Sequence, residues 1–92
     1  MIHLKNSQEI SAMKDAGRIT GEALLAARDA VRPGVSTEEI NRVIEHYIRK
    51  CGAEPTFLGY GGFPASACIS INDEVIHGIP SHSRQIRPGD IV

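Results

Sequence analysis

Residues 36–52 read STEEINRVIEHYIRKCG, and this stretch contains the clearest helix start in the chain. Ser36 and Glu39 have the spacing of a capping box, in which each side chain accepts a hydrogen bond from the other residue's backbone N–H. Gly52 favours the left-handed conformation that ends a helix. We therefore expect a helix over about 36–51. The apolar residues of its buried face recur at steps of three and four and are Ile40, Val43, Ile44, Tyr47 and Ile48.

A longer apolar pattern precedes this helix. Asn6 and Glu9 stand at capping-box spacing before the pattern. The dipeptide Pro33-Gly34 interrupts it, because proline disfavours helical geometry in the residue before it and glycine opens a turn. The pattern predicts a first helix over about 7–32. Its apolar members form one stripe and are Ile10, Met13, Ala16, Ile19, Ala23, Leu24, Ala27 and Val31.

After residue 54, glycine and proline separate three short runs of strand-forming residues. We expect strands at 56–58, 67–71 and 74–77. Two helices followed by short antiparallel strands, all within about 54–92, define an α+β fold. The 92 residues allow one domain at most. A chain of this size buries only about 60% of its unfolded surface, so we expect a thin core.

Composition restricts the classes of protein to which the chain can belong. Hydrophobic residues make up 41% and charged residues 23%, which is ordinary for a soluble globular protein. No apolar run approaches the roughly 20 residues of a membrane span, and a signal peptide is not evident, so we expect a cytoplasmic protein without a membrane role. A net charge of −1 and few aromatic residues do not favour nucleic-acid binding. Cys51 and Cys68 are expected to be reduced, and their spacing does not indicate a zinc site.

The block GYGGFPASACISINDEVIHGIP, residues 59–80, places His77 between a strand-like run and a Gly-Ile-Pro corner. Ser66 and Ser70 lack a recognisable acid with which to form a serine-nucleophile triad with His77. The His-Glu-x-x-His pattern of metal ligands is also absent. The familiar catalytic patterns therefore leave His77 as the one candidate for chemistry.

Two interpretations of this candidate site remain open from the residues alone. His77 could donate to a backbone carbonyl at a strand end, or its neutral imidazole could act near pH 7 on a bound molecule. Gly78 would let another part of the backbone approach closely in either case. Tyr60 and Phe63 could pack in the core, or they could line, together with Cys68, a small apolar pocket for an unbranched side chain.

Three elements of the block, Tyr-x-Gly-Phe-Pro, Cys-Ile-Ser-Ile-Asn and Val-Ile-His-Gly-Ile-Pro, together resemble type I methionine aminopeptidase. The segments 14–17 and 32–37 fit the same family, so the resemblance covers nearly the whole chain. It implies the N-terminal half of a pita-bread fold, in which two similar α/β halves surround a dinuclear metal site. It also implies a cytosolic enzyme that removes the initiator methionine from nascent chains when the next residue is small. The parent enzyme would require two divalent metal ions, such as cobalt, manganese, iron or zinc.

The resemblance also implies roles for single residues. His77 matches a histidine that interacts with the substrate at the scissile amide and helps to stabilise the transition state. Phe57 and Gly61 differ from the residues that some members carry at those positions, so no role is carried over to either. The pocket for the methionine side chain is lined by the residues that match Tyr60, Phe63 and Cys68.

The metal ligands of the family, two aspartates, a histidine and two glutamates, all lie beyond the matched segment. Asp90 belongs to a strand start and is not one of them. We therefore expect residues 1–92 to be a truncated, incomplete domain without activity, because amide hydrolysis needs the metal to activate water. The alternative is a non-catalytic peptide- or protein-binding module that retains the methionine-pocket wall. Self-association, or pairing with the missing C-terminal half, would cover the apolar face left exposed.

Overall fold

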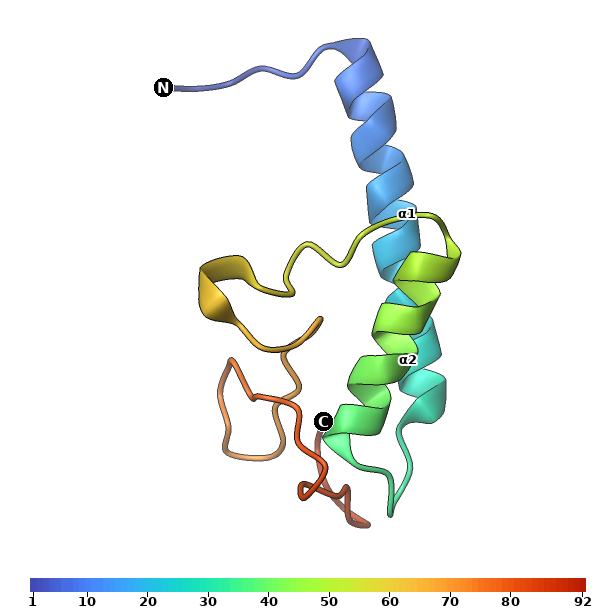
Figure 1. Ribbon diagram of the computed structural model, residues 1–92, viewed down its shortest axis with the longest axis vertical. Coiled ribbons are helices and arrows are strands. Elements are labelled where there is room, and N and C mark those ends of the chain that lie inside the picture. The colour runs from blue at the N-terminus through green and yellow to red at the C-terminus, as the bar shows by residue number, and fades with distance from the viewer.

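The computed structural model describes residues 1–92 and contains two α-helices that lie side by side (Figure 1). Helix α1 spans Ser7–Ala30 and helix α2 spans Thr37–Lys50. A single 3-10 turn, η1, covers Tyr60–Gly62. The two helices predicted over about 7–32 and 36–51 are confirmed, with ends that differ by one or two residues.

Both helices begin at the capping boxes that the sequence predicts. At α1, the Glu9 N–H donates to the Asn6 side chain at 2.9 Å, and the Asn6 N–H donates to the Glu9 carboxylate at 2.8 Å. At α2, the corresponding bonds between Ser36 and Glu39 measure 3.1 and 3.0 Å. These bonds satisfy backbone donors that have no partner within the helix, which is why the local sequence defines both starts.

The core lies where the second half of α1 meets α2 and the loops that follow. Only 15 of the 92 residues are buried, so the core is as thin as the chain length predicts. The first half of α1 projects beyond α2 (Figure 1), which leaves Ile10 45% and Met13 58% exposed. Of the apolar stripe predicted for α1, only Ala23 and Ala27 are buried, and Leu24 in the second half is 63% exposed. The core cluster consists of Ala23, Ala27, Ile40, Ile44, Ile69, Ile71 and Ile86.

The structure contains no β-strand, and the strands predicted at 56–58, 67–71 and 74–77 are wrong. A strand requires a ladder of backbone hydrogen bonds to a neighbour. The Ile69 N–H does donate to the carbonyl of Gly78 at 2.8 Å, but the Gly78 N–H donates to the Ser70 hydroxyl, so no ladder continues. The one β-bridge in the chain pairs Ser36 with Gln85. The segment after α2 is thus a set of turns and extended pieces folded against the helices.

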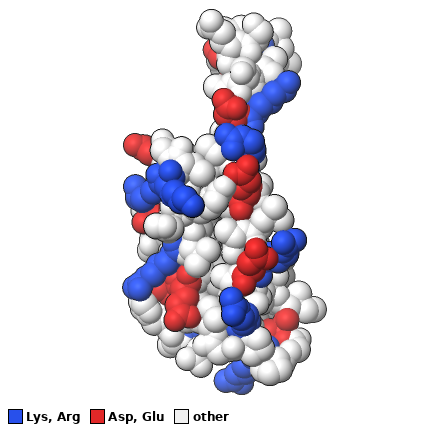
Figure 2. Space-filling view, turned by 90° about the vertical axis from the view of Figure 1, so that its right-hand side faces the viewer, with Lys and Arg blue, Asp and Glu red and all other residues white.

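Opposite charges are interspersed over the helical face of the molecule, and Figure 2 shows no region of a single sign on that face. Exposed pairs of this kind contribute little to stability, because solvent screens them. No helix is both long enough and apolar enough to cross a membrane. The ion pairs with a spacing of four residues are Arg18–Glu22, Glu38–Arg42 and Glu45–Arg49, at 3.2, 3.4 and 3.2 Å.

Candidate functional site

Three of the four predicted site residues line one open hollow on the surface. Tyr60, Phe63 and His77 meet there around a volume of about 520 Å³. Cys68 does not join them, because it lines a different, apolar hollow between the two helices and residues 90–92. The structure therefore brings together a histidine and aromatic side chains, and separates the cysteine from them. The remaining lining residues of the aromatic hollow are Phe57, Gly61, Gly62, Pro64 and Ile79.

A pair of stacked rings forms one wall of the hollow. The centroids of Phe57 and Phe63 are 4.8 Å apart and the ring planes differ by 20°. Tyr60 lies between them in the chain, on η1, and is 76% exposed. Phe57 was not among the predicted site residues. The sequence does contain a signal for it, since Phe57 and Phe63 each lie three residues from Tyr60. A tight turn at Tyr60 brings the two flanking rings together.

Helix α2 anchors the loop that carries these rings. The side-chain oxygen of Asn41 accepts the backbone N–H groups of Ser66 and Ala67, at 2.9 and 3.2 Å. One helical turn further on, Glu45 accepts the Ser66 hydroxyl at 2.6 Å. That hydrogen bond, and to a smaller extent the neighbouring Arg49, holds the pKa of the Glu45 carboxyl below its usual value. Asn41 and Ser66 are both buried, so the aromatic loop is attached to the core where it leaves the hollow.

His77 has an unusual backbone conformation. Its φ angle is +60°, in the left-handed region that residues with a Cβ rarely adopt. The side chain is exposed and its imidazole makes no hydrogen bond within the chain. The structure thus does not support the interpretation in which His77 donates to a backbone carbonyl. Its imidazole is available to a molecule in the hollow.

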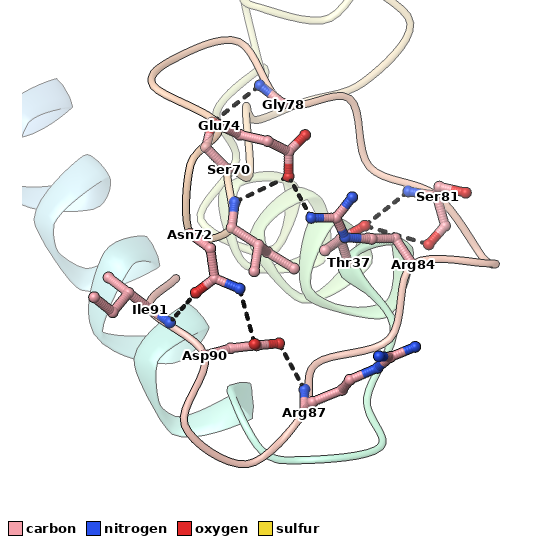
Figure 3. Close-up of polar contacts among 11 residues, drawn as sticks. Thr37, Ser70, Asn72, Glu74, Gly78, Ser81, Arg84, Arg87, Asp90 and Ile91 are labelled. Atoms are coloured by element: carbon pink, nitrogen blue, oxygen red, sulfur yellow. Dashed lines mark hydrogen bonds and ion pairs between the residues drawn. The ribbon is translucent and has the colours of Figure 1, made fainter.

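The residue after His77 is locked in place by the chain beside it (Figure 3). Gly78 is buried, and its N–H donates to the Ser70 hydroxyl at 3.0 Å. Its carbonyl accepts the Ile69 N–H at 2.8 Å. A Cβ on Gly78 would overlap the carbonyl of Ile69, so no other residue fits here without a backbone shift. The predicted close approach of backbone at Gly78 is confirmed.

A second polar network fixes the end of the chain (Figure 3). The Asn72 backbone N–H donates to the carbonyl of Ile91 at 2.9 Å, and the Asn72 side-chain oxygen accepts the Ile91 N–H at 3.0 Å. Its side-chain amide also donates to Asp90 at 2.9 Å. That bond, followed by the backbone N–H of Arg87, lowers the pKa of the Asp90 carboxyl. Both oxygens of the Asp90 carboxylate therefore accept hydrogen bonds that hold this loop in place.

The chain matches the model of metallopeptidase family M24 over residues 11–92 and belongs to that family. It is 53% identical over 92 residues to the methionine aminopeptidase of Clostridium acetobutylicum, covering 100% of this chain and 37% of that protein. It is 48% identical over 88 residues to methionine aminopeptidase 1 of Mycobacterium tuberculosis, covering 96% of this chain and 33% of that protein. The resemblance to methionine aminopeptidase is thus confirmed, and the chain spans about a third of the length of these relatives.

The fold is also that of solved members of the family. The methionine aminopeptidase of Rickettsia prowazekii superposes with a TM-score of 0.92 at 37% identity, over 98% of this chain and 36% of that one. The enzyme of Thermotoga maritima superposes with a TM-score of 0.96 at 35% identity, over 99% of this chain and 36% of that one. The two helices and the loops around the hollow therefore have the arrangement found in the pita-bread fold of these proteins.

Membership of a metallopeptidase family implies divalent metal ions in the parent enzyme. Residues 1–92 contain no group of three or more His, Cys, Asp or Glu side chains that could hold a metal ion. His77 is the only His, Cys, Asp or Glu residue that lines its hollow. The Asp90 carboxylate accepts hydrogen bonds from Asn72 and Arg87. The side chains of these residues therefore offer no arrangement that fits the metal ions of the family.

Proposed function

We propose that residues 1–92 form one wall of the substrate site of a methionine aminopeptidase, which removes the initiator methionine from newly made proteins. The single observation that carries this proposal is the hollow that His77 lines together with the aromatic residues Tyr60 and Phe63. A largely apolar lining with one polar group suits an unbranched apolar side chain attached to a peptide bond. The similarity to methionine aminopeptidases, at 53% and 48% identity, supports the same substrate.

In this proposal different residues of the hollow contact different parts of the substrate. The stacked rings of Phe57 and Phe63, together with Tyr60, contact the methionine side chain, since thioethers pack favourably against aromatic rings. The His77 imidazole donates a hydrogen bond to the carbonyl oxygen of the scissile amide. Such a donor stabilises the negative charge that develops on this oxygen during hydrolysis. Cys68 remains a prediction from the resemblance alone, because it lines the other hollow.

The proposal assigns the metal centre to residues outside 1–92. The two divalent ions of the parent enzyme, whether cobalt, manganese, iron or zinc, supply the activation of water when bound. Residues 1–92 by themselves are then a binding wall without hydrolytic activity, in an incomplete catalytic domain. A cytoplasmic location follows from the same proposal, since nascent chains carry their initiator methionine there.

Peptide titration tests the assignment of the hollow. Adding Met-Ala-Ser to the isotope-labelled chain is expected to shift the NMR signals of Tyr60 and His77 at millimolar peptide. A peptide with norleucine in place of methionine should bind equally, because its side chain is also unbranched and apolar. Asp-Ala-Ser should leave both signals in place. An absence of shifts with Met-Ala-Ser, or equal shifts with the aspartyl peptide, would remove the proposed substrate.

The catalytic part of the proposal has a separate test. Incubation of the 92-residue chain with Met-Ala-Ser and cobalt or manganese is expected to release no methionine above a metal-only blank. Turnover above that blank would contradict the assignment of the metal centre to other residues. The alternative function, a non-catalytic peptide- or protein-binding module, shares the hollow with the main proposal, and the same titration excludes it when no signals move.

Apolar side chains outside the hollow support a proposal about assembly. Leu24, Leu25, Val75, Ile76 and Ile91 are large, apolar and exposed. Large exposed apolar side chains favour association, because burying them removes apolar surface from water. Self-association of the chain, or pairing with the part of the family fold that it does not contain, would cover these residues. Sedimentation at high concentration measures this directly, and a clean monomer would contradict self-association.

A further inference from the structure

The serine at position 70 is bonded to the backbone next to the candidate catalytic histidine. Its hydroxyl accepts the Gly78 N–H at 3.0 Å, and the preceding residue, Ile69, donates its N–H to the Gly78 carbonyl at 2.8 Å. Figure 3 shows Ser70 and Gly78 facing each other across two segments of the loop. Both polar groups of the Gly78 backbone are thus held by two consecutive residues of the neighbouring segment.

This arrangement accounts for the conformation of His77. A φ of +60° is unfavourable for a residue with a Cβ, so the surrounding structure must hold it there. The peptide that follows His77 ends at the Gly78 nitrogen, and the hydrogen bond to Ser70 fixes the direction of that nitrogen. Gly78 packs too closely on the Ile69 backbone to move towards it, and a movement away would break this bond and the bond from the Ile69 N–H.

We propose that Ser70 is a positioning residue for His77: its hydroxyl holds the Gly78 amide, keeps His77 in the left-handed conformation and so aims the imidazole into the hollow. This inference rests on the proposed role of His77 at the scissile amide. It assigns the Ser70 hydroxyl a role as hydrogen-bond acceptor rather than as a nucleophile. The neighbouring Ile69 is buried in the core, which anchors the segment that carries Ser70.

Substitution at Ser70 tests the proposal through the backbone of His77. A positive φ brings a residue's own amide and Hα protons together, so His77 should give a strong intraresidue amide–Hα NOE, well above that of Ile76. In Ser70→Ala this cross-peak is expected to fall to the intensity shown by Ile76. Ser70→Thr, which keeps a hydroxyl at the same position, should retain it. Ser83→Ala is the matched control, since the Ser83 hydroxyl contacts only Ser81.

The α2 amide signals report whether each variant is folded. A strong His77 cross-peak in folded Ser70→Ala would overturn the proposal, as would a weak one in the unsubstituted chain. Amide hydrogen exchange gives a second measurement that needs no variant. The Gly78 N–H should exchange at least about tenfold more slowly than the exposed Val75 N–H, and equal rates would also overturn the proposal. The peptide titration is independent of these results, so failure of the proposed function and failure of the Ser70 role can be told apart.

Discussion

The side-chain oxygen of Asn41 accepts the backbone N–H of Ser66 at 2.9 Å, across 25 residues of sequence. Asn41 is on the buried face of α2, and Ser66 ends the loop that carries the aromatic rings of the hollow. A secure helix therefore determines where a segment without regular structure leaves the core. We expect the position of Phe63 to depend on this bond, because only two residues separate Phe63 from Ser66.

Replacing Asn41 with leucine should destabilise the fold. The Ser66 and Ala67 amides would be left without an acceptor, and one buried, unpaired donor costs about 1–3 kcal/mol in the free energy of unfolding. Urea denaturation of Asn41→Leu measures the loss. The control is Arg42→Leu, which changes an exposed neighbour on the same helix and should alter stability by no more than about 0.5 kcal/mol. Equal losses in the two variants would contradict a special role for Asn41.

Two glycine-to-alanine substitutions should act in opposite directions. Gly78→Ala places a methyl group on the Ile69 carbonyl and should cost about 1–3 kcal/mol through overpacking. Gly17→Ala adds a methyl group within α1, where nothing lies within 4 Å, and should stabilise the helix by about 0.5–1 kcal/mol. Thermal unfolding of both variants checks the signs. A stabilising Gly78→Ala substitution would show that the chain does not pack closely at this point.

The contact between Tyr47 and Glu22 predicts a pH dependence. The Tyr47 hydroxyl donates to Glu22, which raises the pKa of Tyr47 to about 12 and lowers the pKa of Glu22. Because the pKa of Tyr47 is above its ordinary value of 10.0, its contribution to stability is complete below that value and is lost as the pH rises through about 12. Glu22 behaves oppositely, so its contribution is present above its ordinary value of 4.5 and is lost as the pH falls through its lowered pKa.

Phenolate absorbance measures this prediction for Tyr47. In a Tyr60→Phe background Tyr47 is the only tyrosine, so the titration has a single source. Glu22→Gln removes the carboxylate and should move the midpoint down from about 12 towards 10.0. Glu54→Gln changes another exposed acid and should leave the midpoint in place. A midpoint that does not respond to Glu22→Gln would exclude this hydrogen bond as the cause.

Loss of a stacked ring should weaken binding of a methionyl peptide. In Phe63→Ala the ring that stacks on Phe57 at 4.8 Å is removed, and with it much of the apolar wall. We expect affinity for Met-Ala-Ser to fall about tenfold, corresponding to about 1.4 kcal/mol of lost contact. Titration followed by NMR gives the affinity. Val75→Ala, at a residue that is 94% exposed and outside the hollow, should bind like the unsubstituted chain.

Much of the helical part of the fold was predictable because its signals are local. Asn6 with Glu9, and Ser36 with Glu39, form their hydrogen bonds within one turn, so neighbouring residues are sufficient to define both helix starts. The motifs around Tyr60, Phe63 and His77 likewise identified the family before any contact was known. The prediction of strands was wrong because a strand forms only when a neighbouring strand pairs with its backbone. The Gly78 N–H donates to the Ser70 hydroxyl and not to a strand neighbour.

The sequence by itself determined the two helices and the family, and it supplied the residues that we propose to contact a substrate, since each is defined by residue types at short spacing. Only the tertiary structure decided which of those residues meet. In the folded chain Phe57 stacks on Phe63, Cys68 lines a different hollow and His77 adopts a left-handed conformation. These outcomes depend on hydrogen bonds between distant segments, such as Asn41 to Ser66, and on the close packing of Gly78 against Ile69. Local residue preferences carry no information about contacts of that kind.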